Sequence, residues 1–545
     1  MMDFASITYL PETKSKSVSN LDTSFTKDFT LSIEFKDIVT FFIIINSFHL
    51  QLIIIYIYIL QFFEILVNVK SIQYYDIITV KTIKNNYKLQ KITKKLWRFM
   101  CKMSKGKVAF LTLGCKVNSY ETDAMEQLFI KSGYEIVDFN TKSDVYIVNT
   151  CSVTNMADRK SRQMLHKAKK NNPNAVVVAV GCYVQAAPEE IIKDEAIDLI
   201  IGNNKKKDIV NIVEEHIART VIDINDTKGN IEYEELEIIK TQENTRAYIK
   251  IQDGCNQFCS YCIIPYVRGR IRSRKLDNIM QEVNSLASNG YKEVVLTGIH
   301  ISSYGLDFQK EKVNGFKYEY LLEVIENISR VNGIERIRLG SLEPRIITDE
   351  FISRLSKIEK VCPHFHLSLQ SGCDETLKRM NRKYTTEQFM NSCNILRKYY
   401  DNPSLTTDVI VGFAGETQEE FDTTYDFLSK VKFSQMHVFK YSIRKGTVAE
   451  KLPNQVNDDM KNKRSKKLIE MSEKNHCEYM DLFKNSKQLV LFEEKTTINN
   501  KEYYIGHNER YVKVAVQSNK TLDNEIISVN IIGQLTKDIL EATLN

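Results

Sequence analysis

Proline and glycine are scarce in this sequence, with 8 Pro and 20 Gly among 545 residues. This scarcity excludes collagen-like and mucin-like chains, and a 43% share of hydrophobic residues excludes a wholly disordered one. With roughly 100 to 200 residues per domain, the length predicts about three or four domains, each able to bury its own core.

A general excess of positive charge is also missing. The formal net charge is +6, but residues 1–102 hold 13 Lys and Arg against 8 Asp and Glu, which leaves 62 against 61 in the rest. Bulk charge is therefore no argument for a nucleic-acid partner, and RNA binding would have to come from local basic patches.

No cleavable signal sequence is recognisable, and the number of cysteines, 11, is odd. Both observations disfavour a secreted disulfide framework. We therefore expect a cytoplasmic protein whose cysteines are reduced thiols, metal ligands or catalytic groups.

One hydrophobic stretch, residues 38–63, has 26 residues without a full charge and is long enough to span a bilayer. Residues 70–102 then carry nine Lys and Arg and one Asp, so a genuine anchor would leave the later domains on the cytoplasmic side. Residues 1–102 are, however, a low-complexity mixture, as expected from translated AT-rich DNA upstream of a true start. We interpret them as an extension that the domains after Met103 do not need, with the membrane anchor as the alternative.

Three apolar runs of strand length each stop close to a cysteine. They are 108–113 before Cys115, 145–148 before Cys151, and 176–180 before Cys182. Amphipathic stretches of helical length, 121–132 and 157–171, lie between them, and a further strand-like run, 197–201, follows. This alternation predicts a doubly wound parallel α/β domain over residues 106–215.

The carboxyl ends of parallel strands lie at one edge of a sheet, so Cys115, Cys151 and Cys182 are expected to converge. Three thiolates suit an iron–sulfur cluster with one open iron, whereas a structural zinc site normally has four protein ligands. The alternative is three small buried residues at strand ends. Recurrence of the same position in three strands favours the cluster.

The most specific motif is C-x3-C-x2-C, formed by Cys255, Cys259 and Cys262, with the aromatic Tyr261 before the last cysteine. Three thiolates on one short loop can hold three irons of a [4Fe-4S] cube and leave the fourth iron open to a small ligand. A zinc site would need a fourth Cys or His, and none follows soon after.

Strand-like and helical runs alternate around this motif and predict a partial (βα)6 barrel over residues 241–475. The six predicted strands are 247–252, 293–298, 336–340, 364–370, 405–412 and 436–441. Chemistry in such barrels takes place at the carboxyl ends of the strands. The polar residues expected there are Thr297, Gly298, Ser341, Glu343, Gln370, Asp408, Gly412 and Glu416.

Together these features resemble the radical S-adenosylmethionine (SAM) methylthiotransferases, which combine a three-cysteine domain, a radical SAM barrel and a small all-β, OB-like TRAM barrel. The stretches that carry the resemblance are 112–118, 149–151, 181–183, 255–274, 296–299, 340–344, 369–372 and 407–417. The resemblance covers all but the first hundred residues. It implies an α/β fold with a TRAM domain over residues 480–545.

The resemblance also implies two [4Fe-4S] clusters and SAM as cofactors. The first three cysteines would ligate an auxiliary cluster that carries or donates the sulfur. The C-x3-C-x2-C cysteines would hold a cluster whose open iron binds SAM, and an electron from it would cleave SAM to a 5′-deoxyadenosyl radical. Tyr261 and the polar strand-end residues are expected to contact SAM.

Two further features concern RNA. The runs 488–492, 511–516 and 526–532 have the strand lengths of an OB-like barrel, which can bind RNA, although a generic β cap is the alternative. Four alternating arginines beside the cluster loop would share one side of an extended segment and suit a phosphate backbone or an anionic substituent, with a solvated salt-bridged edge as the alternative. These are Arg268, Arg270, Arg272 and Arg274.

Branches of the family act on isopentenylated adenosine, on threonylcarbamoylated adenosine or on a ribosomal-protein aspartate. The Leu-Gly-Cys-Lys-Val-Asn form of residues 113–118 resembles the threonylcarbamoyl branch. The predicted reaction is therefore 2-methylthiolation of N6-threonylcarbamoyladenosine just 3′ of a tRNA anticodon, with the anticodon loop, an external electron donor and a sulfur source as partners. The other branches are alternatives, as is a non-enzymatic iron–sulfur redox sensor that binds RNA; the polar strand-end residues argue against the sensor.

Overall fold

The computed structural model describes residues 105–215, 221–223, 232–238, 245–308 and 318–544. The hydrophobic stretch 38–63 lies outside these residues, so the dispensable extension and the membrane anchor both stay predictions. Among the residues that are described, no helix has the length and apolar character needed to cross a membrane.

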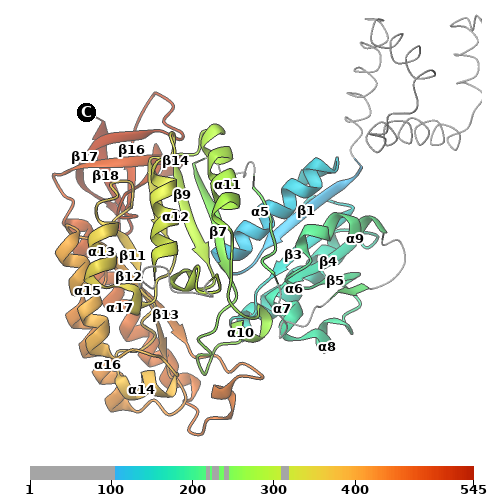
Figure 1. The fold of residues 1–545 in the computed structure, drawn as a ribbon, viewed down its shortest axis with the longest axis horizontal. Helices are drawn as coiled ribbons and strands as arrows, with labels where there is room; N and C mark the ends of the chain where they lie inside the picture. The colour runs from blue at the N-terminus through green and yellow to red at the C-terminus, as the bar shows by residue number, and fades with distance from the viewer. Residues whose placement is uncertain (1–104, 216–220, 224–231, 239–244, 309–317, 545) are drawn as a thin grey trace, which may run out of the picture. The chain divides into compact units, whose positions relative to one another are not determined.

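The first part of the described chain is a six-stranded parallel sheet with the order β2-β1-β3-β4-β5-β6 (Figure 1). Its strands are β1 (Lys107–Thr112), β2 (Glu135–Val137), β3 (Val145–Thr150), β4 (Val176–Gly181), β5 (Leu199–Ile201) and β6 (Val221–Asp223). Its helices are α5 (Lys116–Lys131), α6 (Asn155–Asn171), α7 (Cys182–Ala186), α8 (Pro188–Ile191) and α9 (Ile209–Glu215). Apolar side chains of α5 and α9 cover one face and those of α6 and α7 the other, which confirms the doubly wound domain.

Helix α5 begins five residues before its predicted start at residue 121. Cys115 occupies the N-cap position without a side-chain capping bond, so the usual Ser, Thr, Asp or Asn signal of a helix start is missing. The cysteine therefore lies at the junction of β1 and α5, not in a longer loop.

The central part is a partial barrel in two sheets, β10-β9-β7-β8 and β11-β12-β13. Its strands are β7 (Arg246–Asp253), β8 (Arg272–Ser273), β9 (Glu293–Gly298), β10 (Arg336–Leu339), β11 (His364–His366), β12 (Ser404–Val411) and β13 (Gln435–Lys440). Isolated parallel bridges, Ile337 to Val361 and Leu342 to Leu367, join the two sheets. The strands other than β8, which pairs antiparallel with β7, run parallel. The six predicted barrel strands are present, but β11 ends four residues early.

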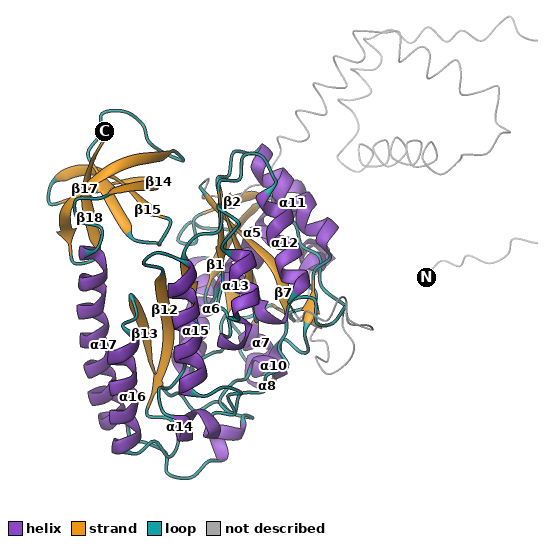
Figure 2. Cartoon of the chain, turned by 60° about the vertical axis from the view of Figure 1, so that its left-hand side comes forward, coloured by secondary structure: helices purple, strands orange, loops and turns teal. Residues whose placement is uncertain are grey.

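The helices of this part pack their apolar faces against the strands, and α17 leads to the C-terminal barrel alongside α16 (Figure 2). They are α10 (Ile264–Val267), α11 (Leu276–Ser288), α12 (Glu319–Ser329), α13 (Asp349–Leu355), α14 (Asp374–Arg379), α15 (Thr386–Tyr399), α16 (Gln418–Val431) and α17 (Asp458–Asp481). Capping boxes at Thr385 and Thr417 fix the starts of α15 and α16.

The C-terminal part is a closed five-stranded barrel with the order β14-β15-β16-β18-β17. Its strands are β14 (Lys487–Ile498), β15 (Lys501–Asn508), β16 (Lys513–Val516), β17 (Ile526–Thr536) and β18 (Ile539–Leu544). The predicted all-β domain is confirmed, although the sequence pattern missed β15 and β18.

Tyr511 of the C-terminal barrel docks at the amino-terminal end of the partial barrel. Its ring stacks on His507 at 4.4 Å and on His364 at 5.2 Å between centroids. The guanidinium carbons of Arg246 and Arg338 lie 4.9 and 4.8 Å from the same ring centroid. The C-terminal barrel thus contacts the end of the partial barrel opposite to the strand ends that carry the cluster motif.

Candidate active site

The C-x3-C-x2-C loop follows β7 and is tied to the far side of the partial barrel. Ser260 N–H donates to Met380 O at 3.0 Å, and Arg382 Nη1 donates to Cys259 Sγ at 3.2 Å. Burial raises the pKa of Cys255 to about 11 and that of Cys262 to about 12. The cation beside Cys259 favours a thiolate there, whereas Cys255 and Cys262 keep their protons until a metal ion displaces them.

A glycine is required immediately before this loop. Gly254 has a φ of +70°, and a Cβ at this position would lie 1.8 Å from the carbonyl oxygen of Arg270. The chain therefore passes too close to itself here for any side chain, which fixes where Cys255 emerges from β7.

The other thiol set lies at the carboxyl ends of β1, β3 and β4. Burial raises the pKa of Cys151 to about 11, and charge on Cys182 and Cys115 adds to this effect. Charge on Cys182 likewise opposes ionisation of Cys115, whose pKa is also raised. Gly181 holds this arrangement, since its Cβ would lie 2.5 Å from the carbonyl oxygen of Thr150. The three cysteines thus follow adjacent parallel strands at one edge of the sheet, and three sulfur donors would fit an open iron–sulfur cluster.

Arg268 touches this thiol set directly. Its Nε donates to Cys182 Sγ at 3.3 Å, and its Nη2 donates to Asn118 Oδ1 at 2.8 Å. The Cys115 thiol in turn donates to the same amide oxygen at 3.7 Å. A fixed guanidinium beside the sulfurs stabilises their anionic form, so Arg268 serves the thiol set.

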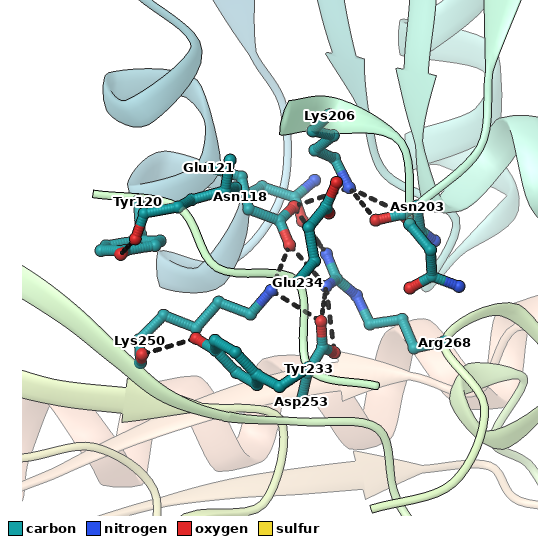
Figure 3. A network of polar contacts seen from close by, with 12 residues as sticks. Asn118, Tyr120, Glu121, Asn203, Lys206, Tyr233, Glu234, Lys250, Asp253 and Arg268 are labelled. Carbon is teal, nitrogen blue, oxygen red and sulfur yellow. Dashed lines mark hydrogen bonds and ion pairs between the residues drawn. The ribbon is translucent and has the colours of Figure 1, made fainter. Parts of the chain in front are cut away.

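Glu121 lies at the centre of a buried ionic network between the first domain and the partial barrel (Figure 3). Its carboxylate lies 2.8 Å from Lys250 Nζ, 2.9 Å from Arg268 Nη1 and 3.2 Å from Lys206 Nζ. A second carboxylate, that of Asp253, lies 2.6 Å from Lys250 Nζ. Burial alone would raise the pKa of Glu121, but the three cations hold it well below its usual range. The network therefore fixes one cysteine-bearing domain against the other.

The predicted arrangement of the four arginines is wrong, because they do not share one exposed side. Arg268, Arg272 and Arg274 are buried and bind carboxylates or carbonyl oxygens of the protein. The short strand β8 pairs with β7 and carries Arg272, whose Nη1 donates to the carbonyl oxygens of Arg268 and Arg270. Arg270 is exposed and lies 4.5 Å from the ring centroid of Phe258, so it is the one of the four that can meet a polyanion.

Two predicted SAM residues lie close to the cluster loop. The Tyr261 ring packs edge-on against Phe413 at 6.3 Å. The Glu343 carboxylate binds Arg345 Nη2 at 2.7 Å and lies 3.6 Å from His300 Nε2. Burial, opposed by Glu343 and aided by nearby arginines, lowers the pKa of His300 to about 4, so the imidazole is neutral at pH 7.

The remaining predicted SAM residues lie at strand ends as expected, but two of them have partners of their own. Thr297 and Gly298 end β9, Ser341 follows β10 and is exposed, and Gln370 follows β11 in a left-handed conformation with a φ of 75°. Gln370 nevertheless forms an isolated bridge with Val409 of β12, beyond the end of β11 at His366.

Asp408 and Glu416 are the two with partners. Asp408 Oδ2 lies 3.4 Å from His366 Nε2. Glu416 Oε2 accepts from the Gly412 N–H at 2.6 Å and from Arg464 at 2.5 Å, which closes the loop after β12.

His366, Asp408 and His437 offer three ligand atoms within 4.8 Å of one another on adjacent strands. Thr406 Oγ1 holds the other ring nitrogen of His366 at 3.0 Å. The positive charge of Lys116 acts on His437, which opposes a second cation here. We interpret the three residues as a hydrogen-bonding group of the inner barrel surface.

The sequence reasoning missed the buried network and Arg382. Lys250 carried a signal, because a charged residue in the apolar run Ala-Tyr-Ile-Lys-Ile needs a buried partner. Glu121 and Lys206 lie in ordinary polar surroundings in sequence, and Arg382 is 123 residues from the thiol it contacts. Their role follows only from the packing of the two domains.

Two family models match the chain. The radical SAM superfamily matches residues 249–428, and a model described as uncharacterized protein family UPF0004 matches residues 107–202. These ranges contain the two thiol sets, so fold and site define a radical SAM enzyme with an additional three-cysteine domain.

Curated relatives are similar over most of their length. The threonylcarbamoyladenosine tRNA methylthiotransferase MtaB of Bacillus subtilis is 40% identical to this chain, over 78% of this chain and 93% of the relative's length. The protein of the same name from Aquifex aeolicus is 39% identical, over 75% of this chain and 98% of the relative's length. A tRNA-2-methylthio-N(6)-dimethylallyladenosine synthase of Acetivibrio thermocellus is 35% identical over 77% and 87%. The chain therefore belongs to the radical SAM tRNA methylthiotransferases, a family that implies SAM and a [4Fe-4S] cluster as cofactors.

Proposed function

We propose that the protein is a tRNA (N6-threonylcarbamoyladenosine-C2)-methylthiotransferase that acts on the adenosine just 3′ of the anticodon. The observation that carries this proposal is the presence of two three-thiol sets, one in each of two domains, with a buried ionic network fixing the domains together. The names of the relatives with 39 and 40% identity support the threonylcarbamoyl substrate.

Cys255, Cys259 and Cys262 would hold the SAM-binding [4Fe-4S] cluster, and the cysteines at the ends of β1, β3 and β4 a second one. When bound, these groups would supply two things: a radical that can act at C2 of adenine, and the sulfur that is transferred. A radical is needed because the hydrogen at C2 is not acidic enough for a base to remove. An external electron donor and a sulfur source complete the reaction.

The residues of the chain position these groups and keep water away. Arg382 and Arg268 place positive charge against Cys259 and Cys182. We assign SAM contacts to Tyr261, Thr297, Gly298, Ser341, Glu343, Gln370 and Gly412. Glu416 would support the SAM site indirectly, because its carboxylate holds the loop that contains Gly412. Asp408 would support it by orienting His366. Positioning of this kind contributes to rate by holding reactants in a productive geometry.

We propose three domains: the three-cysteine domain over residues 106–215, the radical SAM barrel over residues 241–475, and a TRAM domain over residues 480–545. The TRAM domain would bind the tRNA. The target base would leave its stack in the anticodon loop to reach the sulfur, which costs little in a loop.

Substrate choice is tested with tRNA that carries either the threonylcarbamoyl or the isopentenyl group. We expect the enzyme to methylthiolate the threonylcarbamoyl form at least about tenfold faster in single-turnover assays, because a charged substituent gains a charge-assisted contact that an apolar one cannot make. Nucleosides of tRNA from a deletion strain should lack the 2-methylthio derivative of threonylcarbamoyladenosine. Equal rates on both tRNAs, or an unchanged nucleoside profile, would contradict the proposed substrate.

Arg270→Gln tests the contact with tRNA phosphates. We expect this variant to bind the threonylcarbamoyl and the isopentenyl tRNA about two- to tenfold more weakly, and with a smaller salt dependence. A contact with a phosphate does not depend on the modification of the base, so both tRNAs should be affected equally. The ratio of the two affinities should stay at the wild-type value. A change in that ratio would show that Arg270 reads the substituent instead.

A further inference from the structure

Helix α17 (Asp458–Asp481) belongs to two parts of the molecule at once (Figure 2). Leu468 lies in the apolar core of the partial barrel, and Ser472 Oγ accepts from the Met436 N–H of β13 at 2.9 Å. In the last turn of the helix, Met480 lies in the apolar core of the C-terminal barrel. The helix is therefore fixed at two places and gives rigid support to the side chains near its start.

Arg464, in the first half of α17, binds the loop that follows β12, residues 412–416. Its Nη1 donates to Glu416 Oε2 at 2.5 Å and to the Glu416 carbonyl oxygen at 3.1 Å. Its guanidinium carbon lies 5.3 Å from the ring centroid of Phe421 in α16. Both Arg464 and Glu416 are buried, so little water competes for this charge-assisted hydrogen bond.

The same carboxylate closes the loop on itself. Glu416 Oε2 also accepts from the Gly412 N–H at 2.6 Å, so the guanidinium of Arg464 holds both ends of the loop through one oxygen atom. Gly412 has a φ of +68°, and a Cβ there would lie 2.3 Å from Cγ of Lys461 in α17. The loop therefore lies directly against the helix, with no room for a side chain at position 412.

On its other side the 412–416 loop packs against the cluster loop. The ring of Phe413 lies edge-on to that of Tyr261, with 6.3 Å between centroids, and Tyr261 stands directly before Cys262. Ala414 and Phe413 share one apolar cluster with Met380, whose carbonyl oxygen accepts from the Ser260 N–H of the cluster loop. The position of the 412–416 loop thus determines part of the surroundings of the cluster loop.

We propose that Arg464 is a positioning residue for SAM: it holds the 412–416 loop in the conformation that receives SAM beside the cluster loop. The inference rests on the proposed function, in which Gly412 contacts SAM. Arg464 acts through Glu416, since its guanidinium reaches the loop by way of that carboxylate. Without the guanidinium, the buried carboxylate has no cation, and the loop spends less time in the conformation that binds SAM.

The test measures binding of S-adenosylhomocysteine to the cluster-reconstituted enzyme by anaerobic equilibrium dialysis. This probe keeps the adenosine, amino and carboxylate groups of SAM but has no sulfonium to cleave and no methyl group to transfer, so binding is measured without turnover. Arg464→Gln should bind the probe about tenfold more weakly than the wild type, because the apparent affinity falls with the populated fraction of the competent loop.

Two further measurements separate positioning from general damage to the fold. Arg464→Gln should still hold about eight irons per chain after reconstitution, because no cysteine has changed. Its affinity for an anticodon stem-loop should stay within about twofold of the wild-type value, because the proposed RNA contacts lie elsewhere.

Companion variants test the role of charge. Arg464→Lys should recover part of the affinity for the probe, because an ammonium group can still pair with Glu416 but lacks the planar fork of a guanidinium. Arg464→Gln combined with Glu416→Gln leaves no buried charge unpaired, and the new amide oxygen can still accept from the Gly412 N–H. This double variant should bind the probe more tightly than Arg464→Gln alone and more weakly than the wild type.

Lys466→Gln is the matched control. Lys466 lies two residues from Arg464 in the same helix and is exposed, so the substitution removes the same charge without touching the loop. Its affinity for the probe should equal that of the wild type.

Wild-type affinity for the probe in Arg464→Gln overturns the positioning role. Equal losses of affinity for the probe and for the stem-loop would show general disruption of α17 and overturn it as well. If Arg464→Gln does not fold, the double variant takes its place, and wild-type affinity there has the same consequence. A wild type that binds the probe but does not methylthiolate threonylcarbamoyl tRNA would instead overturn the proposed function, which leaves the role of Arg464 standing.

Discussion

Replacing Cys255, Cys259 and Cys262 together by Ala is expected to abolish methylthiolation and to remove about half of the bound iron. Anaerobic reconstitution of the wild type should give about eight irons per chain, as two four-iron clusters require. The variant should keep about four, because the cysteines at the ends of β1, β3 and β4 form a separate ligand set. Iron analysis, visible absorption and electron paramagnetic resonance of the remaining cluster measure the outcome.

Cys393→Ala is a suitable control for this experiment. Cys393 is buried in the apolar core and contacts neither ligand set, so this variant should keep about eight irons. Loss of all iron, or of none, in the triple variant would contradict two independent clusters.

The buried ionic network around Glu121 is expected to contribute strongly to the stability of the folded protein. Glu121→Gln is expected to lower the free energy of unfolding by about 3 to 5 kcal/mol, because it leaves Lys206, Lys250 and Arg268 buried with too little negative charge. Asp253 compensates only part of that charge. Chemical denaturation of the apoprotein measures the loss, and limited proteolysis between the first domain and the barrel reports whether the domains separate.

Two comparison variants sharpen this prediction. Glu135→Gln removes a carboxylate from an exposed position of β2 and should change the free energy of unfolding by less than about 0.5 kcal/mol. Adding Lys250→Met to Glu121→Gln should recover part of the loss, because it removes one of the uncompensated cations. A Glu121→Gln protein as stable as the wild type would show that water or rearrangement compensates the network.

The network also explains why the two cysteine-bearing domains act as one unit. Arg268 contacts Glu121 of α5, Asp253 at the end of β7 and the Cys182 sulfur at the same time. Ion pairs with this degree of burial fix geometry more than they add stability, since desolvation offsets much of their attraction. Their contribution here is the fixed placement of one thiol set relative to the other.

The sequence by itself determined the features that depend on local pattern and motif. Apolar runs that stop close to a cysteine predicted β1, β3 and β4 of the first domain, although β2 and β6 were missed. The spacing of Cys255, Cys259 and Cys262 predicted the cluster loop. Both follow from short-range constraints: alternation of apolar residues, a glycine where the chain approaches itself, and ligands on one loop. For the same reason the family was recognisable before any tertiary contact was known.

Only the tertiary structure decided which charged side chains are available to a ligand. Arg268 and Arg270 look alike in sequence, yet one is fully buried against Glu121 and the other is exposed. The burial of a charge depends on partners more than a hundred residues away, such as Glu121 for Arg268. No local pattern encodes that, since the electrostatic environment of a side chain is set by the fold as a whole.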